Sequence, residues 1–222
     1  MYGVSRNFDK LRRALSSLFT LRCVCCGKAA ADGKCLCADC ESALVPAVKL
    51  RPGEGLYFSR FAAKYEYSGG AKTAFLRFKF SGDYRLCSDT VFDWLLAAFD
   101  ENFSPEEFDF IIPVPAFGGR KTRFSVLVKR LAHYREIPFA PELLVKTRKT
   151  EKQHNLSAEL RKTNLAGAFC ADPAVLKKRI LLVDDVMTTG NTVNECSKAL
   201  AAAGAANIAV LTVLKTNPFE KI

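Results

Sequence analysis

Apolar positions along the chain follow two different spacings, and the two spacings alternate. Short apolar runs predict buried strands at 108–114, 180–183 and 208–214, a strand region at 56–66 and a short strand at 143–146. Apolar residues three and four apart predict helices over 70–80, 86–99, 124–134, 157–165 and 192–203, the last ending before Gly204. Strands that alternate with helices predict an α/β fold with a mainly parallel sheet flanked by helices.

The N-terminal region has a different pattern. Residues 8–19 show helical apolar spacing with a basic polar face, which suits either packing on a neighbouring element or contact with a membrane or nucleic acid. A stretch rich in proline and glycine, 52–55, predicts a linker. We therefore expect an N-terminal module over 1–48 and a larger domain over 49–222.

Charge changes this picture by pointing to anionic partners. The 222 residues include 33 Lys and Arg against 23 Asp and Glu, a net charge of +10. Such a surplus favours phosphorylated small molecules or nucleic acid and does not choose between them. No apolar stretch is long enough for a membrane span, and the N-terminus lacks a signal-peptide pattern, so we expect a cytoplasmic protein without membrane insertion.

Nine cysteines are present, and six of them lie between Cys23 and Cys40. In a reducing compartment such a cluster points to metal rather than to disulfides. Two Cys-x-x-Cys pairs suit a tetrahedral structural Zn²⁺ site, and the predicted ligands are Cys23, Cys26, Cys37 and Cys40. The short segment has little apolar mass, so bound metal would supply its stability. Cys25 and Cys35 are left without a role.

The segment after the apolar run 180–183 carries the most informative chemistry. Asp184 and Asp185 stand at the predicted strand end, where ligands bind in open α/β sheets. The loop that follows comprises Val186, Met187, Thr188, Thr189, Gly190, Asn191 and Thr192. Its backbone N–H groups and hydroxyls suit a phosphate, while the two carboxylates suit ribose hydroxyls and water on Mg²⁺. The pattern therefore predicts a site for a phosphorylated sugar.

Several cations are candidates for a second anion site. After Pro113-Val114-Pro115, paired glycines stand beside basic residues, an arrangement that suits a diphosphate or a basic surface loop. The cationic segment 146–164 suits either a mobile lid or a solvated connection. The candidate pyrophosphate-binding residues are Lys79, Arg120, Lys121, Arg123, Arg148 and Lys152.

The segment from Val183 to Thr192 resembles the 5-phosphoribosyl-1-pyrophosphate (PRPP) motif of type I phosphoribosyltransferases, and the cysteine pairs extend the resemblance to the ComF family with its GntX-type members. Further matching segments are Lys79-Phe80 with Gly82-Asp83, Pro113-Val114-Pro115, Gln153, Leu156-Ser157, Arg161, Asn164-Leu165 and Gly167-Ala168-Phe169. The chain departs from the family at Thr122-Arg123-Phe124-Ser125-Val126, where the family usually shows Arg-Gly-Phe-Asn-Gln.

The resemblance implies a cytosolic, zinc-containing protein with the type I phosphoribosyltransferase fold. One hypothesis is an enzyme, a glycosyltransferase that moves the phosphoribosyl group of PRPP, with Mg²⁺, to an unidentified acceptor and releases pyrophosphate. The other is a non-catalytic module that binds PRPP and single-stranded DNA in competence and DNA uptake, with a helicase-like partner. Asp184 and Asp185 would be the catalytic residues in the first case.

Overall fold

The computed structural model describes residues 21–31, 33–48, 55–119, 121–148, 165 and 167–217. Contacts divide the chain into two compact units, Met1–Val45 with Ser68–Asp93, and Pro46–Tyr67 with Trp94–Ile222. The helix predicted over 8–19 and nearly all of the one predicted over 157–165 lie outside the described residues. The division at residues 48 and 49 stays a prediction.

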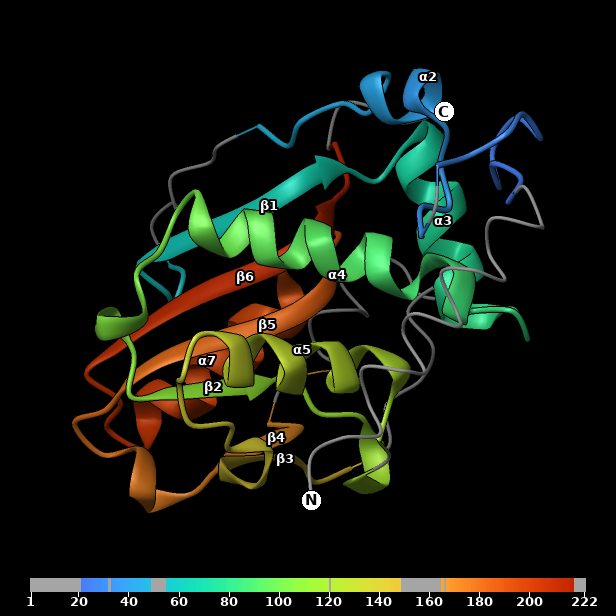
Figure 1. Cartoon of the computed structure of the whole chain (residues 1–222). Helices are drawn as coiled ribbons and strands as arrows, with labels where there is room; N and C mark the ends of the chain where they lie inside the picture. The colour runs from blue at the N-terminus through green and yellow to red at the C-terminus, as the bar shows by residue number, and fades with distance from the viewer. Residues whose placement is uncertain are drawn as a thin grey trace, which may run out of the picture. The chain divides into compact units, whose positions relative to one another are not determined.

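The second unit is built on a four-stranded parallel sheet (Figure 1). The strand order is β1 (Arg60–Glu66), β6 (Asn207–Lys215), β5 (Arg179–Met187) and β2 (Phe110–Pro113). Each of these neighbouring pairs is parallel, as the alternation of strands with helices predicts. The α/β prediction is therefore confirmed.

Helices cover both faces of this sheet. The helix α7 (Asn191–Ala202) lies across one face and α5 (Arg123–Tyr134) across the other (Figure 1). Ile180 and Leu182 of β5 form one core cluster with Val193, Cys196 and Leu200 of α7. Both faces of β5 are buried, which explains why its first part reads as a continuous apolar run rather than as an alternation.

The N-terminus of α5 explains the local departure from the family pattern. The Thr122 hydroxyl accepts a hydrogen bond from the Ser125 N–H at 3.0 Å, and the Ser125 hydroxyl accepts one from the Thr122 N–H at 3.1 Å. This reciprocal pair satisfies two N–H groups that the first helical turn leaves without an intrahelical acceptor. The departing residues thus serve to begin the helix.

Smaller elements complete the second unit. The strands β3 (Leu144–Lys146) and β4 (Phe169–Ala171) form an antiparallel pair. Short 3₁₀ helices span η1 (Pro105–Glu107), η2 (Phe117–Gly119), η3 (Pro141–Leu143) and η5 (Pro173–Val175).

The first unit contains the cysteine segment, α2 (Ala38–Ser42), α3 (Gly69–Phe80) and the first part of α4 (Arg85–Asp100). The Cys35 N–H donates to the Thr90 hydroxyl at 3.2 Å, which ties the cysteine segment to α4. At Gly70 an added Cβ would lie 3.4 Å from the Leu44 side chain, so α3 also packs closely on this segment. None of the described helices combines the length and the apolar character needed to cross a bilayer.

Candidate functional site

The carboxyl ends of the parallel strands define one edge of the sheet in the second unit. β2 and β5 are neighbours, so the segments that follow Pro113 and Met187 leave the sheet at the same edge. The Val114 N–H donates to the Val183 carbonyl at 2.8 Å and extends this pairing beyond β2. Ligands of open α/β sheets bind at this edge, which makes it the candidate binding site.

Asp184 and Asp185 lie within β5, not after it as the apolar run alone predicts. Asp184 is in register with Thr212 of β6, and the pairing continues to Met187 opposite Lys215. Backbone pairing continues because strand hydrogen bonds do not depend on side-chain polarity. Both acids are only partly buried, and the Asp184 carboxylate accepts a hydrogen bond from the Asp185 N–H at 2.8 Å. Neither acid is therefore part of the apolar core.

The two carboxylates leave opposite faces of β5, because side chains alternate along a strand. Asp184 shares the α7 face with Ile180 and Leu182. The buried Cys196 thiol of α7 agrees with this placement: burial raises its pKa, and the negative charge of Asp184 raises it further. Asp184 therefore lies on the side where α7 begins.

A three-residue turn, Thr188 to Gly190, connects β5 to α7. Gly190 has a φ of +78°, a backbone conformation that favours glycine, and a Cβ added there would meet only the end of the flexible Met187 side chain, at 2.8 Å. No side chain caps α7 at Gly190. The N–H groups of its first turn can therefore receive an acceptor from outside the helix, such as a phosphate oxygen.

Thr216, the residue that follows β6, supports this turn. The Thr216 N–H donates to the Met187 carbonyl at 2.9 Å, and the Thr216 hydroxyl contacts the Thr188 carbonyl at 3.3 Å. The turn is thus held by the strand next to β5 while the side chains of Thr188 and Thr189 remain exposed. A fixed turn with exposed hydroxyls is the arrangement that the sequence predicts for a phosphate cradle.

Two further lysines of the second unit are not among the site residues named from the sequence, although one of them, Lys146, begins the cationic segment 146–164. Lys215 ends β6 opposite Met187 and is 7% exposed; burial lowers the pKa of its ammonium group, and the charge of Glu66 opposes that effect. Lys146 ends β3 with its Nζ 5.6 Å from the centre of the Phe169 ring, and burial lowers its pKa as well. For Lys215, a lysine at the end of the mainly apolar run from Ile208 to Leu214 is a signal that the sequence already contains.

The candidate pyrophosphate-binding residues fall into three groups. Lys121, Arg123 and Arg148 belong to the second unit, where Arg123 begins α5. Lys79 belongs to α3 of the first unit. Arg120 and Lys152 lie outside the described residues, so a shared anion site for the whole set stays a prediction.

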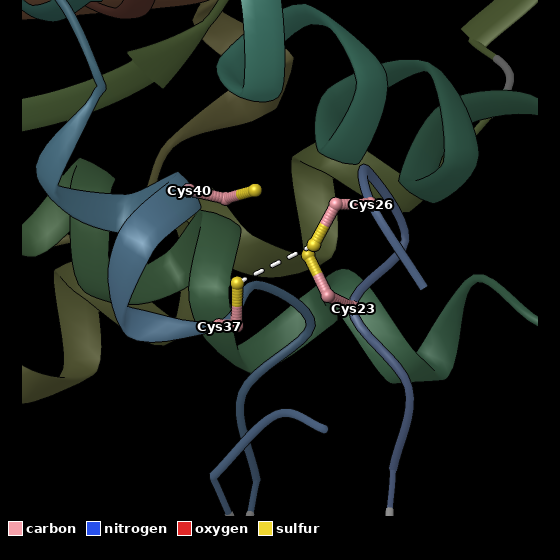
Figure 2. Close-up of side chains that lie close together, drawn as sticks. All are labelled: Cys23, Cys26, Cys37 and Cys40. Carbon is pink, nitrogen blue, oxygen red and sulfur yellow. Dashed lines mark hydrogen bonds between the residues drawn. The ribbon is translucent and has the colours of Figure 1, made fainter. Parts of the chain in front are cut away.

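The first unit brings together the four cysteines that the sequence predicts as metal ligands. Figure 2 shows Cys23 and Cys26 from one loop facing Cys37 and Cys40 from the start of α2. The four sulfur atoms all lie within 4.8 Å of one another, and those of Cys26 and Cys37 are 3.5 Å apart. Tetrahedral zinc with Zn–S bonds of about 2.3 Å separates its sulfurs by about 3.8 Å. The cluster therefore fits a metal of that kind.

Backbone geometry prepares the first loop for such a site. The Gly27 N–H donates to the Cys23 carbonyl at 2.9 Å, and Gly27 has a φ of +76°. Burial raises the pKa of the Cys23 thiol, but hydrogen bonds from the backbones of Cys26, Cys37 and Cys25 outweigh it and lower the pKa to about 6. Stabilised thiolate is the form that binds metal.

The two remaining cysteines of this segment lie apart from the cluster. Cys25 is exposed, whereas Cys35 is buried and hydrogen-bonds the equally buried Cys87 thiol of α4, a contact that lowers the Cys35 pKa. The question that the sequence left open for Cys25 and Cys35 is thus answered in part, because neither belongs to the four-thiol cluster.

A family model described as "Phosphoribosyl transferase domain" matches residues 95–218 of this chain, and the chain belongs to that family. The match includes β2, β5, α7 and β6, and therefore the whole candidate site at the sheet edge. The relatives that match form a group named for competence and DNA utilization, and this likeness agrees with the ComF resemblance drawn from the sequence.

Two curated relatives illustrate this group. "DNA utilization protein YhgH" of Salmonella typhi is 36% identical over 113 residues, which cover 49% of this chain and 50% of that protein. "Competence protein ComFC" of Streptococcus pneumoniae is 27% identical over 204 residues, 83% of this chain and 89% of that protein. The match thus spans about half the length of the first relative and most of the second.

Among solved structures, the purine phosphoribosyltransferase of Pyrococcus horikoshii is 21% identical with a TM-score of 0.38. That similarity covers 60% of this chain and 91% of that one.

Proposed function

We propose that this chain binds PRPP at the turn between β5 and α7. The observation that carries the proposal is the uncapped start of α7 at Gly190, placed directly after two partly buried carboxylates. The N–H groups of the first helical turn and the hydroxyls of Thr188, Thr189 and Thr192 would hold the 5-phosphate. Asp184 and Asp185 would accept hydrogen bonds from the ribose hydroxyls.

The same geometry supports phosphoribosyl transfer as the reaction. An acceptor would attack C1 of the ribose while the bond to pyrophosphate breaks, through an oxocarbenium-like transition state. The carboxylates of β5 are oxygen donors that suit Mg²⁺, and a bound Mg²⁺ would supply neutralisation of the diphosphate charge. The chain's own contribution is to hold the ribose at a fixed sheet edge and to place cations beside the leaving group. Lys121, Arg123 and Arg148 are the described candidates for that second role in this unit.

An assay of pyrophosphate release tests the enzyme proposal. The protein is incubated with PRPP, Mg²⁺ and a panel of nucleobases and other amines, and release is compared with saturable PRPP binding. We expect acceptor-dependent release that follows PRPP occupancy. Saturable binding without release for every acceptor would leave a PRPP-binding protein that is not a transferase.

A second candidate function is a non-catalytic module for PRPP and single-stranded DNA in competence and DNA uptake, acting with a helicase-like partner. Two observations favour it: the relatives carry the names DNA utilization and competence protein, and Phe80 on α3 is 71% exposed. The Lys79 Nζ lies 5.9 Å from the Phe80 ring centre. An exposed ring beside a cation suits base stacking on a single strand.

Titration with labelled single-stranded DNA at several salt concentrations tests this candidate. Phe80→Ala should weaken binding by about 1–3 kcal/mol. Leu176→Ala, which removes an exposed apolar side chain without an aromatic ring from the second unit, should leave it unchanged. An affinity that does not change with salt concentration, or equal losses of affinity in the two variants, would argue against a stacking surface on α3.

We further propose that the four-thiol cluster binds structural Zn²⁺ and that the protein is cytoplasmic. The sulfur spacing supports zinc, as set out above. None of the nine cysteines, all of them in the described part of the chain, forms a disulfide, which is the usual state in a reducing compartment.

A further inference from the structure

The first unit contains a cavity that no role described so far uses. Its volume is about 200 Å³. The residues that line it come from the cysteine segment, α3 and the start of α4: Leu21, Arg22, Cys23, Val24, Lys34, Cys35, Arg77 and Leu86. All of them belong to the first unit.

Apart from the cysteines, the charged residues of this lining are all cations. Arg22, Lys34 and Arg77 contribute positive charge, and no carboxylate is among the lining residues. Leu21, Val24 and Leu86 supply apolar surface to the same cavity. Cations beside apolar wall suit an anion that carries a small carbon skeleton, because a concave site strengthens the field of its charges.

Each of the three cations retains hydrogen-bond donors for a ligand. Arg77 uses Nε and Nη2 to bind the Asp83 carboxylate at 3.1 and 2.9 Å, which leaves Nη1. The Lys34 ammonium, with three donors, binds the Asp93 carboxylate at 2.9 Å. Arg22 donates from Nη1 to the Gly27 carbonyl at 3.2 Å, and no carboxylate in the described part of the chain pairs with it.

Size restricts the class of ligand. A water molecule takes about 30 Å³ of liquid volume, so the cavity has room for roughly seven waters. That is below the roughly 300 Å³ at which pockets for larger organic ligands begin. A phosphate group with a few carbon atoms fits within it.

We propose that this cavity binds the phosphate group of a small phosphorylated molecule, held by Arg22, Lys34 and Arg77. The planar forks of the two arginines match phosphate oxygens, and the lysine adds a point charge. The site belongs to the first unit and does not depend on PRPP binding at the turn between β5 and α7.

Amide chemical shifts locate the ligand in the intact, zinc-loaded protein. Inorganic phosphate and glycerol 3-phosphate are titrated separately, and the N–H signals of Val24 and Cys35 report on the cavity. The signals of Thr188 and Gly190 report on the other candidate site in the same titration. We expect saturable shifts at Val24 and Cys35, larger for the phosphate ester. Shifts confined to Thr188 and Gly190, or none in the cavity up to millimolar ligand, would overturn the proposal.

Matched variants then separate a built site from general surface charge. Arg22→Gln should weaken binding in the cavity about tenfold, as expected for loss of a hydrogen bond from a charged donor. Lys28→Gln removes an equal charge from the same segment, but Lys28 pairs with Asp39 and does not line the cavity. This variant should change affinity less than twofold. Equal effects in the two variants would mean that phosphate is attracted by general surface charge and not bound by the cavity.

Two controls keep the result interpretable. Metal content and melting temperature show whether Arg22→Gln disturbs the cysteine segment, and Arg77→Gln from α3 gives a second test that leaves that segment intact. A single-stranded oligonucleotide without a terminal phosphate is the last arm. If it shifts the cavity signals while both small ligands fail, the surface binds a nucleic acid backbone and the small-molecule proposal is wrong.

Discussion

Asp184 and Asp185 are charged residues in the part of β5 that follows its buried core. Their backbone positions are fixed by pairing with β6, whereas their side chains are only partly buried. Two adjacent acids at the end of a strand do not stabilise the core, because burial of a charge is unfavourable. Their presence is best explained by a ligand.

Replacing both acids by amides tests that explanation. The Asp184→Asn, Asp185→Asn double variant should lose PRPP binding, since neutral amides are weaker acceptors for ribose hydroxyls and poor donors to Mg²⁺. Its fold should be unchanged, because strand pairing needs only the backbone. Calorimetric titration with PRPP and circular dichroism measure the two properties. Wild-type affinity in this variant would remove the carboxylates from the site.

Gly190 is the residue at which local geometry is most restrictive. Gly190→Ala should destabilise the protein by about 1–2 kcal/mol, because an alanine would have to hold a positive φ and its Cβ would displace the end of the Met187 side chain. PRPP affinity should fall as well, since the start of α7 shifts. Chemical denaturation and PRPP titration check the two effects.

Gly82→Ala is the matched control for that substitution. An added Cβ at Gly82 would have nothing within 4 Å, and Gly82 does not have a positive φ. Its effect on stability should be within about 0.5 kcal/mol. A similar loss of stability in both variants would mean that the positive φ of Gly190 does not explain the effect.

At the scale of elements, β2 and β5 are joined at their amino ends by a charged pair. The Asp109 carboxylate accepts hydrogen bonds from Arg179, from its backbone N–H at 2.7 Å and from Nη2 at 3.0 Å. The hydrogen bond from the Arg179 side chain is the main cause that lowers the Asp109 pKa to about 2. This pair lies at the sheet edge opposite the candidate site.

A lowered pKa makes this contribution depend on pH in a defined direction. The pair stabilises the fold above the unfolded pKa of about 3.9, and the stabilisation is lost as pH falls towards 2. Asp109→Asn should cost about 1 kcal/mol at pH 7, a figure reduced for solvent exposure. The difference from wild type should vanish between pH 4 and 2 in urea denaturation curves. A difference that persists at pH 2 would assign it to packing instead.

The cysteine segment gives an equally direct test. The purified, reduced protein should contain about one equivalent of zinc, and Cys23→Ser should lose it together with the folded cysteine segment. Cys25→Ser should keep both, because the exposed Cys25 is outside the four-thiol cluster. Metal analysis and thermal denaturation measure these outcomes. Less than half an equivalent in wild type would contradict the zinc proposal.

The apolar pattern could predict most elements of the sheet. Ile180 to Val183 and Ile208 to Leu214 have little solvent exposure on either face, and such strands produce uninterrupted apolar runs. The pattern could not show that β5 continues through Asp184 to Met187, because polar side chains conceal backbone pairing. Nor does it indicate β4, whose three residues are too few to establish a periodicity; β3 is equally short but is indicated by the apolar run from Leu143 to Val145.

The candidate site was predictable where chemistry is concentrated in one segment. The acids, threonines and glycine between 184 and 192 stand together in the sequence, so their joint role could be inferred. Lys215 comes from another strand, and only the pairing of β6 with β5 shows that it lies opposite Met187, directly before the turn. The cavity in the first unit is hidden for the same reason, since α3 and α4 supply part of its wall.

At the scale of the whole molecule, ligand binding should be visible as stability. A ligand at 100 times its Kd stabilises the folded state by about 2.7 kcal/mol. For a chain of this size, PRPP with Mg²⁺ should then raise the melting temperature by roughly 5–10 °C. Differential scanning fluorimetry checks this value, with the Asp184→Asn, Asp185→Asn variant as control. An equal shift in that variant would place the ligand elsewhere.

The pairing of β5 with β6 up to Met187 and Lys215 has a consequence for the entropy of ligand capture. Only Thr188, Thr189 and Gly190 separate this paired strand from α7, so few backbone torsions remain to be frozen when an anion arrives. At about 1–2 kcal/mol per immobilised residue, the ordering penalty of the turn is at most about 3–6 kcal/mol. Tight anchoring by a neighbouring strand thus lets a small phosphate be captured without the refolding of a long segment.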